Sequence, residues 1–155
     1  RDLVQQILAF SRLDDPAKKP VQLGSIVKET LKMLRASLPA TIEMRQEVAA
    51  RYDRLLEGSV IVPKVRRGNV SAWAQYSVLH PRRDAVTKKL RDAGIPTAVY
   101  YPIPLHLQEA FAALGCRRGD FPVAEKIAGE IFSLPMHPYL EAQAQEKIAA
   151  AIQGN

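Results

Sequence analysis

The run from Tyr100 to His106, Tyr-Tyr-Pro-Ile-Pro-Leu-His, constrains the fold of this chain more than any other segment. Each of its prolines, Pro102 and Pro104, fixes the backbone φ near about −65° and removes one N–H donor. Each also keeps the residue before it out of the helical region. The chain must therefore continue as a stiff, extended segment where the β-type run of residues 97–101 ends.

Spacing leaves two interpretations of this run open. In the first, an edge strand simply ends at Pro102 and Tyr100 lies in the core, as prolines commonly end strands. In the second, a rigid strand exit presents two phenols and the imidazole of His106 as one wall of a ligand site. Spacing alone favours the first interpretation.

Composition places the chain among soluble, disulfide-free domains. Its 155 residues allow one domain or two small pieces, and 47% hydrophobic residues are enough for a core. No apolar run approaches the roughly 20 residues that span a bilayer, and no signal peptide opens the chain. The chain begins Arg-Asp-Leu, which suggests a piece of something longer, and its single cysteine, Cys116, excludes an internal disulfide. The cytoplasm fits these features.

The net charge of +6 raises the question of nucleic-acid binding. The paired basic residues are scattered and lie beside turn signals, at 66–67, 82–83 and 117–118. They form no basic stripe interleaved with aromatic residues. The charge pattern therefore predicts a solvated surface and no nucleic-acid partner.

Hydrophobic periodicity predicts helices with a few strands between them. Helices are expected over 1–12, 23–37, 82–93, 107–114, 123–132 and 141–152, and strands over 60–65, 72–79 and 97–101. Pro39 is expected to end the second helix, and Asp120 to cap the helix at 123–132. Residues 41–57 could begin with a strand, but their amphipathic pattern predicts one helix closed by Gly58. Strands interleaved with helices indicate an α+β fold.

Searches for catalytic motifs find little. The glycines do not have the spacing of a phosphate-binding loop, and there is no Gly-x-Ser-x-Gly nucleophile motif. The histidines, His80, His106 and His137, lie too far apart in sequence to suggest a metal site. No lysine has a recognisable Schiff-base setting. If the chain comes from an enzyme, its catalytic residues are either dispersed along the sequence or lie in a part of the protein that is missing here.

Residues from about 45 to 153 resemble the C-terminal region of the DegT/DnrJ/EryC1/StrS family of pyridoxal-phosphate-dependent sugar aminotransferases. The resemblance implies the small domain of a fold-type-I aminotransferase, with a few-stranded, mostly antiparallel sheet and flanking helices. The matching segments occur in order along the chain: Arg51–Leu56, Val62-Pro63, Ser71–Val78, Arg83-Asp84, Leu90–Ile95, Tyr100–Gln108, Gly119–Glu125 and Ser133–Met136.

Family members move an amino group, commonly from glutamate, to a keto sugar nucleotide, with the cofactor as electron sink. The sequence most resembles those of members that aminate a UDP-linked 3-keto sugar, often a uronic acid. The lysine that carries the cofactor lies in the family's large domain, which would precede residue 45. The resemblance therefore implies no catalytic residue here, no binding of pyridoxal phosphate by this chain alone, and no activity alone.

The same resemblance places the Tyr-Tyr-Pro-x-Pro-Leu-His loop near the active-site cleft. Tyr101 and His106 are its first candidates for contacts to a nucleotide-sugar substrate, and Tyr100 and Gln75 its second.

Apolar surface is expected to be exposed near Trp73, Tyr100 and Leu105, which favours self-association.

Residues 1–44 resemble a different protein, a sensor histidine kinase. Asp2–Arg12 is similar to the end of its second dimerisation helix, and Pro20–Glu43 to the start of its ATP-binding domain. The chain is then a composite of residues 1–44 and 45–155, through gene fusion, gene decay or an assembly artefact. Neither kinase activity nor ATP binding follows. The phosphoacceptor histidine would precede Arg1, and the ATP-binding motifs that should follow Glu43 are replaced by aminotransferase sequence. The alternative functions are a two-component signalling fragment that dimerises through its helices and a basic binding module.

Overall fold

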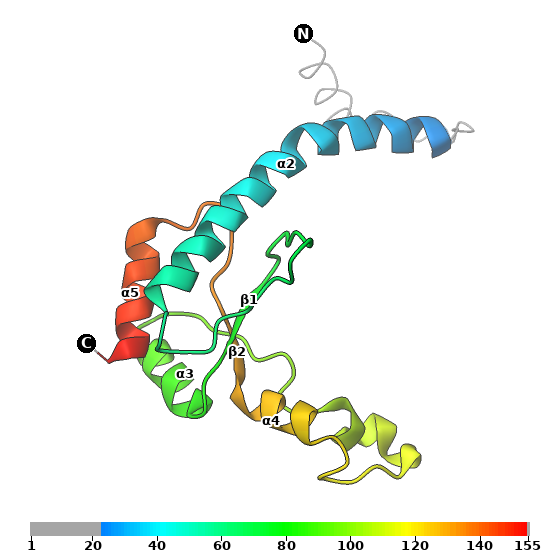
Figure 1. Cartoon of the computed structure of the whole chain (residues 1–155). Coiled ribbons are helices and arrows are strands. Elements are labelled where there is room, and N and C mark those ends of the chain that lie inside the picture. The colour runs from blue at the N-terminus through cyan, green and yellow to red at the C-terminus, as the bar shows by residue number, and fades with distance from the viewer. Residues whose placement is uncertain (1–22, 155) are drawn as a thin grey trace, which may run out of the picture. The chain divides into compact units, whose positions relative to one another are not determined.

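A computed structural model describes residues 23–154 (Figure 1). The chain divides into two compact units, residues 1–36 and residues 37–155. One helix, α2 (Leu23–Leu55), crosses that boundary, and the remaining elements belong to the second unit. They are β1 (Tyr76–Leu79), α3 (Arg83–Asp92), the 3₁₀ turns η1 (Leu105–Leu107) and η2 (Glu109–Leu114), α4 (Pro122–Glu130), β2 (Ile131–Leu134) and α5 (Ala142–Gln153).

The core forms where the C-terminal half of α2 meets α5. Val48, Ala49 and Tyr52 recur at helical spacing and are buried, so this face of α2 packs inward. The buried Gln145 of α5 donates a hydrogen bond to the carbonyl of Val48 and accepts one from Arg51. In Figure 1 the two helices accordingly lie side by side. Strands and helices complete the core with Leu56, Tyr76, Val78, Val86, Leu90, Phe132, Leu134, Ile148, Ala149 and Ile152.

Strands β1 and β2 pair antiparallel at the centre of the second unit. Tyr76 lies opposite Leu134 and Leu79 opposite Ile131. The cross-strand pair Ser77 and Ser133 joins its hydroxyl oxygens at 2.8 Å. Single antiparallel bridges extend the sheet on both sides, from Ile61 to Leu79 and from Ala98 to Ser133. The fold is therefore α+β, with helices around a small antiparallel sheet.

The first long helix departs from the sequence prediction. The helix expected to end at Pro39 continues to Leu55, so the helix predicted over 41–57 is confirmed but begins much earlier. A proline inside a helix removes one backbone hydrogen bond, whereas burial of Val48, Ala49 and Tyr52 stabilises the turns that follow. Packing thus overrides the local stop signal. The helix predicted over 1–12 and the linker after it lie outside the described residues.

The strand predictions were correct in place and wrong in extent. The runs 60–65 and 97–101 contribute one bridge each, and the run 72–79 is a strand only from Tyr76. The helix predicted over 123–132 ends at Glu130, and the next residues form β2. Pairing with β1 takes Ile131–Leu134 out of the helix and buries Phe132 and Leu134. The helix predicted over 107–114 is a pair of 3₁₀ turns.

Candidate functional site

An apolar cavity of about 670 Å³ lies between the segment after Tyr100 and helix α4. The chain leaves its bridge at Ala98 as an extended segment, and Pro102 and Pro104 keep it extended until η1 begins at Leu105. This segment lines one side of the cavity with Tyr101 and His106, and α4 lines the other with Ala124, Ile127 and Ala128.

A second cavity of about 350 Å³ shares Tyr100 with the first. Its lining is more polar and includes Gln75, Thr97 and Ser133. The structure therefore brings the four predicted substrate residues to two cavities that meet at Tyr100. Tyr100, Tyr101 and His106 line the first cavity, whereas Gln75 and Tyr100 line the second.

Neither tyrosine of the opening motif is a core residue. Tyr100 is 51% exposed and Tyr101 is 65% exposed, so the interpretation that placed Tyr100 in the core is wrong. Their rings meet edge to face with centroids 6.5 Å apart, and the peptide bond between them is cis. Both phenols are thus presented at the surface of the cavity.

His106 is held differently, because its imidazole is enclosed by α4. Its side chain is 9% exposed, and its Nε2 lies 3.1 Å from Oε1 of Glu125, whose side chain is 14% exposed. The ring of Phe121 lies over it at a centroid distance of 4.7 Å. His106 therefore lines the cavity with one ring nitrogen already engaged.

Glu125 also accepts a hydrogen bond from the amide of Gly119 at 2.7 Å. Gly119 has φ of 98°, a conformation that side chains disfavour, so glycine suits this turn. The Gly119 amide, followed by the hydrogen bond from His106, holds the pKa of the Glu125 carboxyl below its usual range. Asp120, predicted as the helix cap, instead accepts the amide of Arg117, and Phe121 occupies the cap position.

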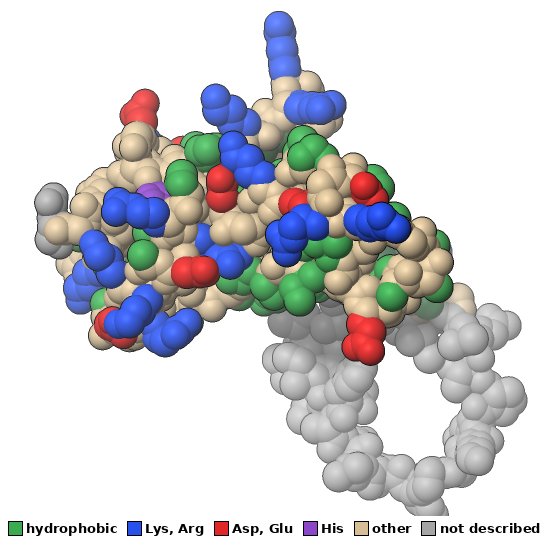
Figure 2. Space-filling model, turned by 90° about the horizontal axis from the view of Figure 1, so that it is seen from below, with side chains coloured by type: hydrophobic (Ala, Val, Ile, Leu, Met, Phe, Trp, Pro, Cys, Tyr) green, Lys and Arg blue, Asp and Glu red, His purple; other side chains and the backbone are tan. Residues whose placement is uncertain are grey.

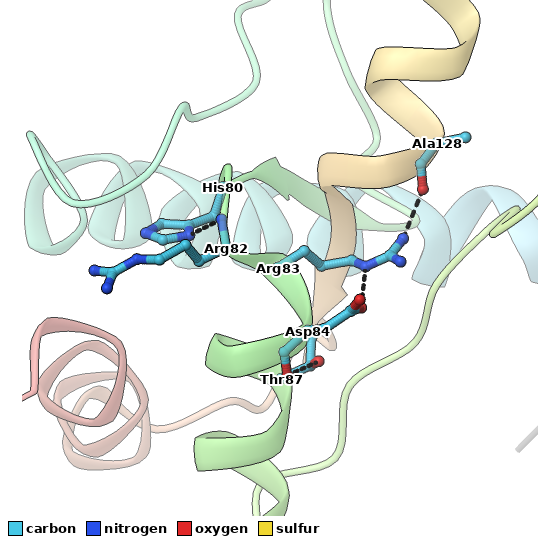
Figure 3. A network of polar contacts seen from close by, with 6 residues as sticks. All are labelled: His80, Arg82, Arg83, Asp84, Thr87 and Ala128. Carbon is cyan, nitrogen blue, oxygen red and sulfur yellow. Dashed lines mark hydrogen bonds and ion pairs between the residues drawn. The ribbon is translucent and has the colours of Figure 1, made fainter.

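The C-terminal end of α4 is held by α3 (Figure 3). The Arg83 guanidinium donates to the carbonyl of Ala128 at 2.6 Å and pairs through Nε with Asp84 at 2.8 Å. The His80 amide donates to the carbonyl of Glu130 at 3.0 Å. A cation at the last turn of a helix is favourable because the free carbonyls there carry partial negative charge. Helix α4 is thus fixed at both ends, and the cavity wall with it.

Comparisons with known proteins identify the family. The model of the DegT/DnrJ/EryC1/StrS aminotransferase family matches residues 30–153. This chain belongs to that family. A "pleiotropic regulatory protein" of Geobacillus stearothermophilus is 44% identical over 71% of the chain and 31% of its own length. The "UDP-2-acetamido-2-deoxy-3-oxo-D-glucuronate aminotransferase" of Pseudomonas aeruginosa is 43% identical over 72% of the chain and 30% of its own length.

Solved aminotransferase structures give the same result. A DegT DnrJ EryC1 StrS aminotransferase from Brucella abortus is 42% identical, with a TM-score of 0.70 over 81% of this chain and 33% of its own. The chain thus spans about a third of the length of these aminotransferases. The family match also begins at residue 30, inside the segment 1–44 that resembles a kinase. The described structure offers no support for that resemblance, which for residues 1–29 stays a prediction.

Aminotransferases of this family use pyridoxal phosphate, which needs a lysine at its carbonyl and donors at its phosphate. The residues lining the two cavities at Tyr100 include neither lysine nor arginine. A third cavity of about 350 Å³ contains Arg118 but no lysine. The residues that line these three cavities therefore do not fit this cofactor. Residues 23–154 also contain no group of three His, Cys, Asp or Glu that could hold a metal ion.

Surface properties agree only partly with the sequence predictions. On the face shown in Figure 2, Lys and Arg side chains are spread among acidic and apolar ones. Leu105 is 58% exposed, as predicted. Near Trp73, Val70 is 83% exposed, whereas Trp73 itself packs against the core with its ring 5.5 Å from that of Tyr76. In the described part of the chain, no helix is long and apolar enough to cross a membrane.

Sequence reasoning missed Glu125 and Phe121 as parts of the site. Phe121 lines the large cavity, and Glu125 fixes the imidazole of His106. The available signal was the turn Gly119-Asp120-Phe121-Pro122, which predicts a helix start with a carboxylate in its first turn. That signal gives the position of Glu125 but not its partner 19 residues earlier.

Proposed function

We propose that this chain is the substrate-facing part of a pyridoxal-phosphate-dependent aminotransferase that acts on nucleotide-linked keto sugars in amino-sugar synthesis. The observation that carries the proposal is the cavity built by the Tyr100–His106 segment within a chain of this family. The amino-transfer chemistry belongs to the cofactor, and none of its steps is assigned to residues of this chain. These residues bind and orient the sugar.

The proposed substrate is a UDP-linked 3-keto amino sugar or uronic acid. Support comes from two relatives, the P. aeruginosa protein and the "UDP-N-acetyl-3-dehydro-alpha-D-glucosamine 3-aminotranferase" of Acidithiobacillus ferrooxidans, which is 36% identical. A relative from Micromonospora megalomicea, at 39% identity, is named for a dTDP-linked sugar. The dTDP sugars are therefore the competing class that an experiment must separate.

The four candidate residues have complementary chemistry for a sugar. The phenols of Tyr100 and Tyr101 can donate and accept hydrogen bonds with sugar hydroxyls. The amide of Gln75 can do the same in the smaller cavity, and the imidazole of His106 adds one nitrogen. Apolar walls from Phe121 and Ile127 suit the face of a ring and exclude water.

The test is a titration of the ¹⁵N-labelled full chain followed by amide spectra. UDP-N-acetylglucosamine should perturb the signals around Tyr100, Tyr101, His106 and Gln75 more strongly than dTDP-glucose or uridine monophosphate. The variant Tyr101→Ala should weaken the response, whereas Tyr139→Ala, at a tyrosine that is 72% exposed and outside these cavities, should not. Equal responses to all three probes, or responses away from the cavities, would refute the proposal.

We also propose that the chain self-associates through the apolar face around the cavity. Leu105 lines the cavity and is 58% exposed, and Val123 of helix α4 is 71% exposed. Exposed apolar patches commonly mark interaction sites. Sedimentation velocity should show concentration-dependent association that Leu105→Glu and Val123→Glu reduce. A monomer at all concentrations would remove this part of the proposal.

A further inference from the structure

The side chain of Glu125 is the point where three parts of the site meet. It lies in the first turn of α4 and accepts hydrogen bonds from the Gly119 amide at 2.7 Å and from Nε2 of His106 at 3.1 Å. Both members of the His106–Glu125 pair are largely buried, with 9% and 14% of their side chains exposed. The contact therefore holds the imidazole of His106 against α4 and restricts its rotation.

The chemistry of a carboxylate decides which way this hydrogen bond runs. The pKa of Glu125 lies below its usual range because the Gly119 amide and His106 stabilise its charged form. At neutral pH the group is therefore ionised, and an ionised carboxylate only accepts hydrogen bonds. His106 must then donate from Nε2. In a neutral imidazole, one protonated nitrogen leaves the other, Nδ1, as an acceptor.

We propose that Glu125 is a positioning residue: whenever the imidazole of His106 is neutral, Glu125 holds it as the Nε2–H tautomer and leaves Nδ1 to accept a hydrogen bond from the ligand. The group that meets His106 is then a donor, a hydroxyl or amino group of the sugar. This assignment of the ligand group rests on the proposed function, whereas the tautomer does not.

The surroundings favour a sugar over a phosphate at this nitrogen. An unprotonated Nδ1 presents a lone pair, which repels phosphate oxygens. The carboxylate of Glu125 adds negative charge beside the imidazole. The other titratable groups that line the cavity are Cys116, Tyr100 and Tyr101, and none is a cation. The guanidinium of Arg118 belongs to the adjoining cavity, which Glu125 lines and the first cavity's tyrosines do not.

The first experiment reads the tautomer directly in the full chain. Long-range ¹H–¹⁵N spectra at about pH 8, above the ordinary histidine pKa of about 6.5, should show Nε2 of His106 protonated and Nδ1 bare. The variant Glu125→Gln should mix the two tautomers, since an amide can donate as well as accept. The matched control Glu109→Gln, at an exposed residue of η2, should change nothing.

A second measurement covers the other contact of the same carboxylate. Hydrogen exchange at the Gly119 amide should become roughly tenfold faster in Glu125→Gln, because hydrogen bonds to a charged acceptor are about twice as strong as neutral ones. It should stay unchanged in Glu109→Gln. Far-ultraviolet circular dichroism of each variant checks that the chain is folded. Unchanged tautomer and unchanged exchange in Glu125→Gln would overturn the positioning role.

The proposed hydrogen bond from the ligand to Nδ1 of His106 is tested separately, with two probes. UDP-N-acetylglucosamine should shift the Nδ1 signal of His106, whereas inorganic phosphate at the same concentration should not. A shift by phosphate, or no shift by either probe, overturns the assignment of a sugar donor at Nδ1. A protonated Nδ1 in the free wild-type chain overturns the tautomer. A correct tautomer in a chain that ignores the UDP-sugar refutes the proposed function and leaves the role of Glu125 standing.

Discussion

Two pairs of tyrosines show how differently the two ends of the second unit use one residue type. Tyr52 and Tyr76 are fully buried, and their rings lie 4.9 Å apart in the core. Their hydroxyls donate to the carbonyl of Pro135 and to the carboxylate of Asp53. Burial raises the pKa of both phenols. Tyr100 and Tyr101, by contrast, are half or more exposed beside the cavity.

The difference separates stability from binding within one small domain. The buried pair contributes packing and internal hydrogen bonds, so its loss should unfold the chain. The exposed pair adds little burial, and its hydroxyls are free to meet a ligand at the surface. Substitutions at the two pairs should therefore have opposite profiles, and the following experiments test that separation.

Truncation of the buried pair should have the largest effect. Tyr76→Ala is expected to lower the free energy of unfolding by about 3–5 kcal/mol, as for other large aromatic residues removed from a core. Tyr101→Ala is expected to change it by at most about 0.5 kcal/mol, as at ordinary surface sites. Urea unfolding followed by circular dichroism measures both. Comparable losses in the two variants would show that the cavity face is part of the core.

Removal of the Arg83 guanidinium, which holds the C-terminal end of α4, should have the second-largest effect on stability. Arg83→Met deletes a charge-assisted hydrogen bond to Ala128 from a side chain that is only 12% exposed, at an expected cost of about 1.5–3 kcal/mol. Hydrogen exchange should accelerate mainly in α4. Arg82→Met, at the neighbouring exposed arginine, is the matched control. Uniform acceleration over the whole chain in Arg83→Met would contradict a local role.

A single hydroxyl tests the buried pair more finely. Tyr52→Phe leaves the carbonyl of Pro135 without its donor and should cost about 1 kcal/mol in urea unfolding. Tyr100→Phe should leave stability unchanged and weaken the response to UDP-N-acetylglucosamine. If Tyr100→Phe destabilised the chain as much, the proposed separation would fail.

The smallest expected effect is the pH-dependent contribution of Glu125 to stability. Its folded-state pKa lies below the ordinary value of 4.5, so the ionised group stabilises the fold at higher pH. This contribution is lost as the pH falls below about 4.5 and through the folded-state pKa. The difference in urea midpoint between wild type and Glu125→Gln should therefore shrink across that range. A constant difference would mean that charge at this site is irrelevant to folding.

Local signals predicted the helices best. Pro81 before α3 and Gly94 after it mark an element that the structure places at Arg83–Asp92, within the predicted 82–93. Strand β2 could not be found this way, because Ile131 and Phe132 also suit the apolar stripe of the preceding helix. Only pairing with β1, some fifty residues earlier in the chain, decides their conformation.

The candidate site likewise has one part that the sequence predicted and one part that it did not. Two prolines and a resemblance predicted the segment Tyr100–His106, since both are properties of neighbouring residues. The contact of His106 with Glu125 depends on how an irregular turn folds back, and such turns have no periodicity to read. The resemblance included Gly119–Glu125 as a matching segment but carried no information on which side chains touch.

The junction of α4 and β2 has a mechanical consequence. The helix ends at Glu130 and the strand begins at Ile131, with no intervening loop. Any ligand that displaced α4 along its axis would have to slide β2 past β1, and a slip of one residue would turn Phe132 and Leu134 away from the interior. Displacement of the helix along its axis is therefore coupled to the register of the sheet, and a ligand that required it would have to break the pairing of β1 and β2.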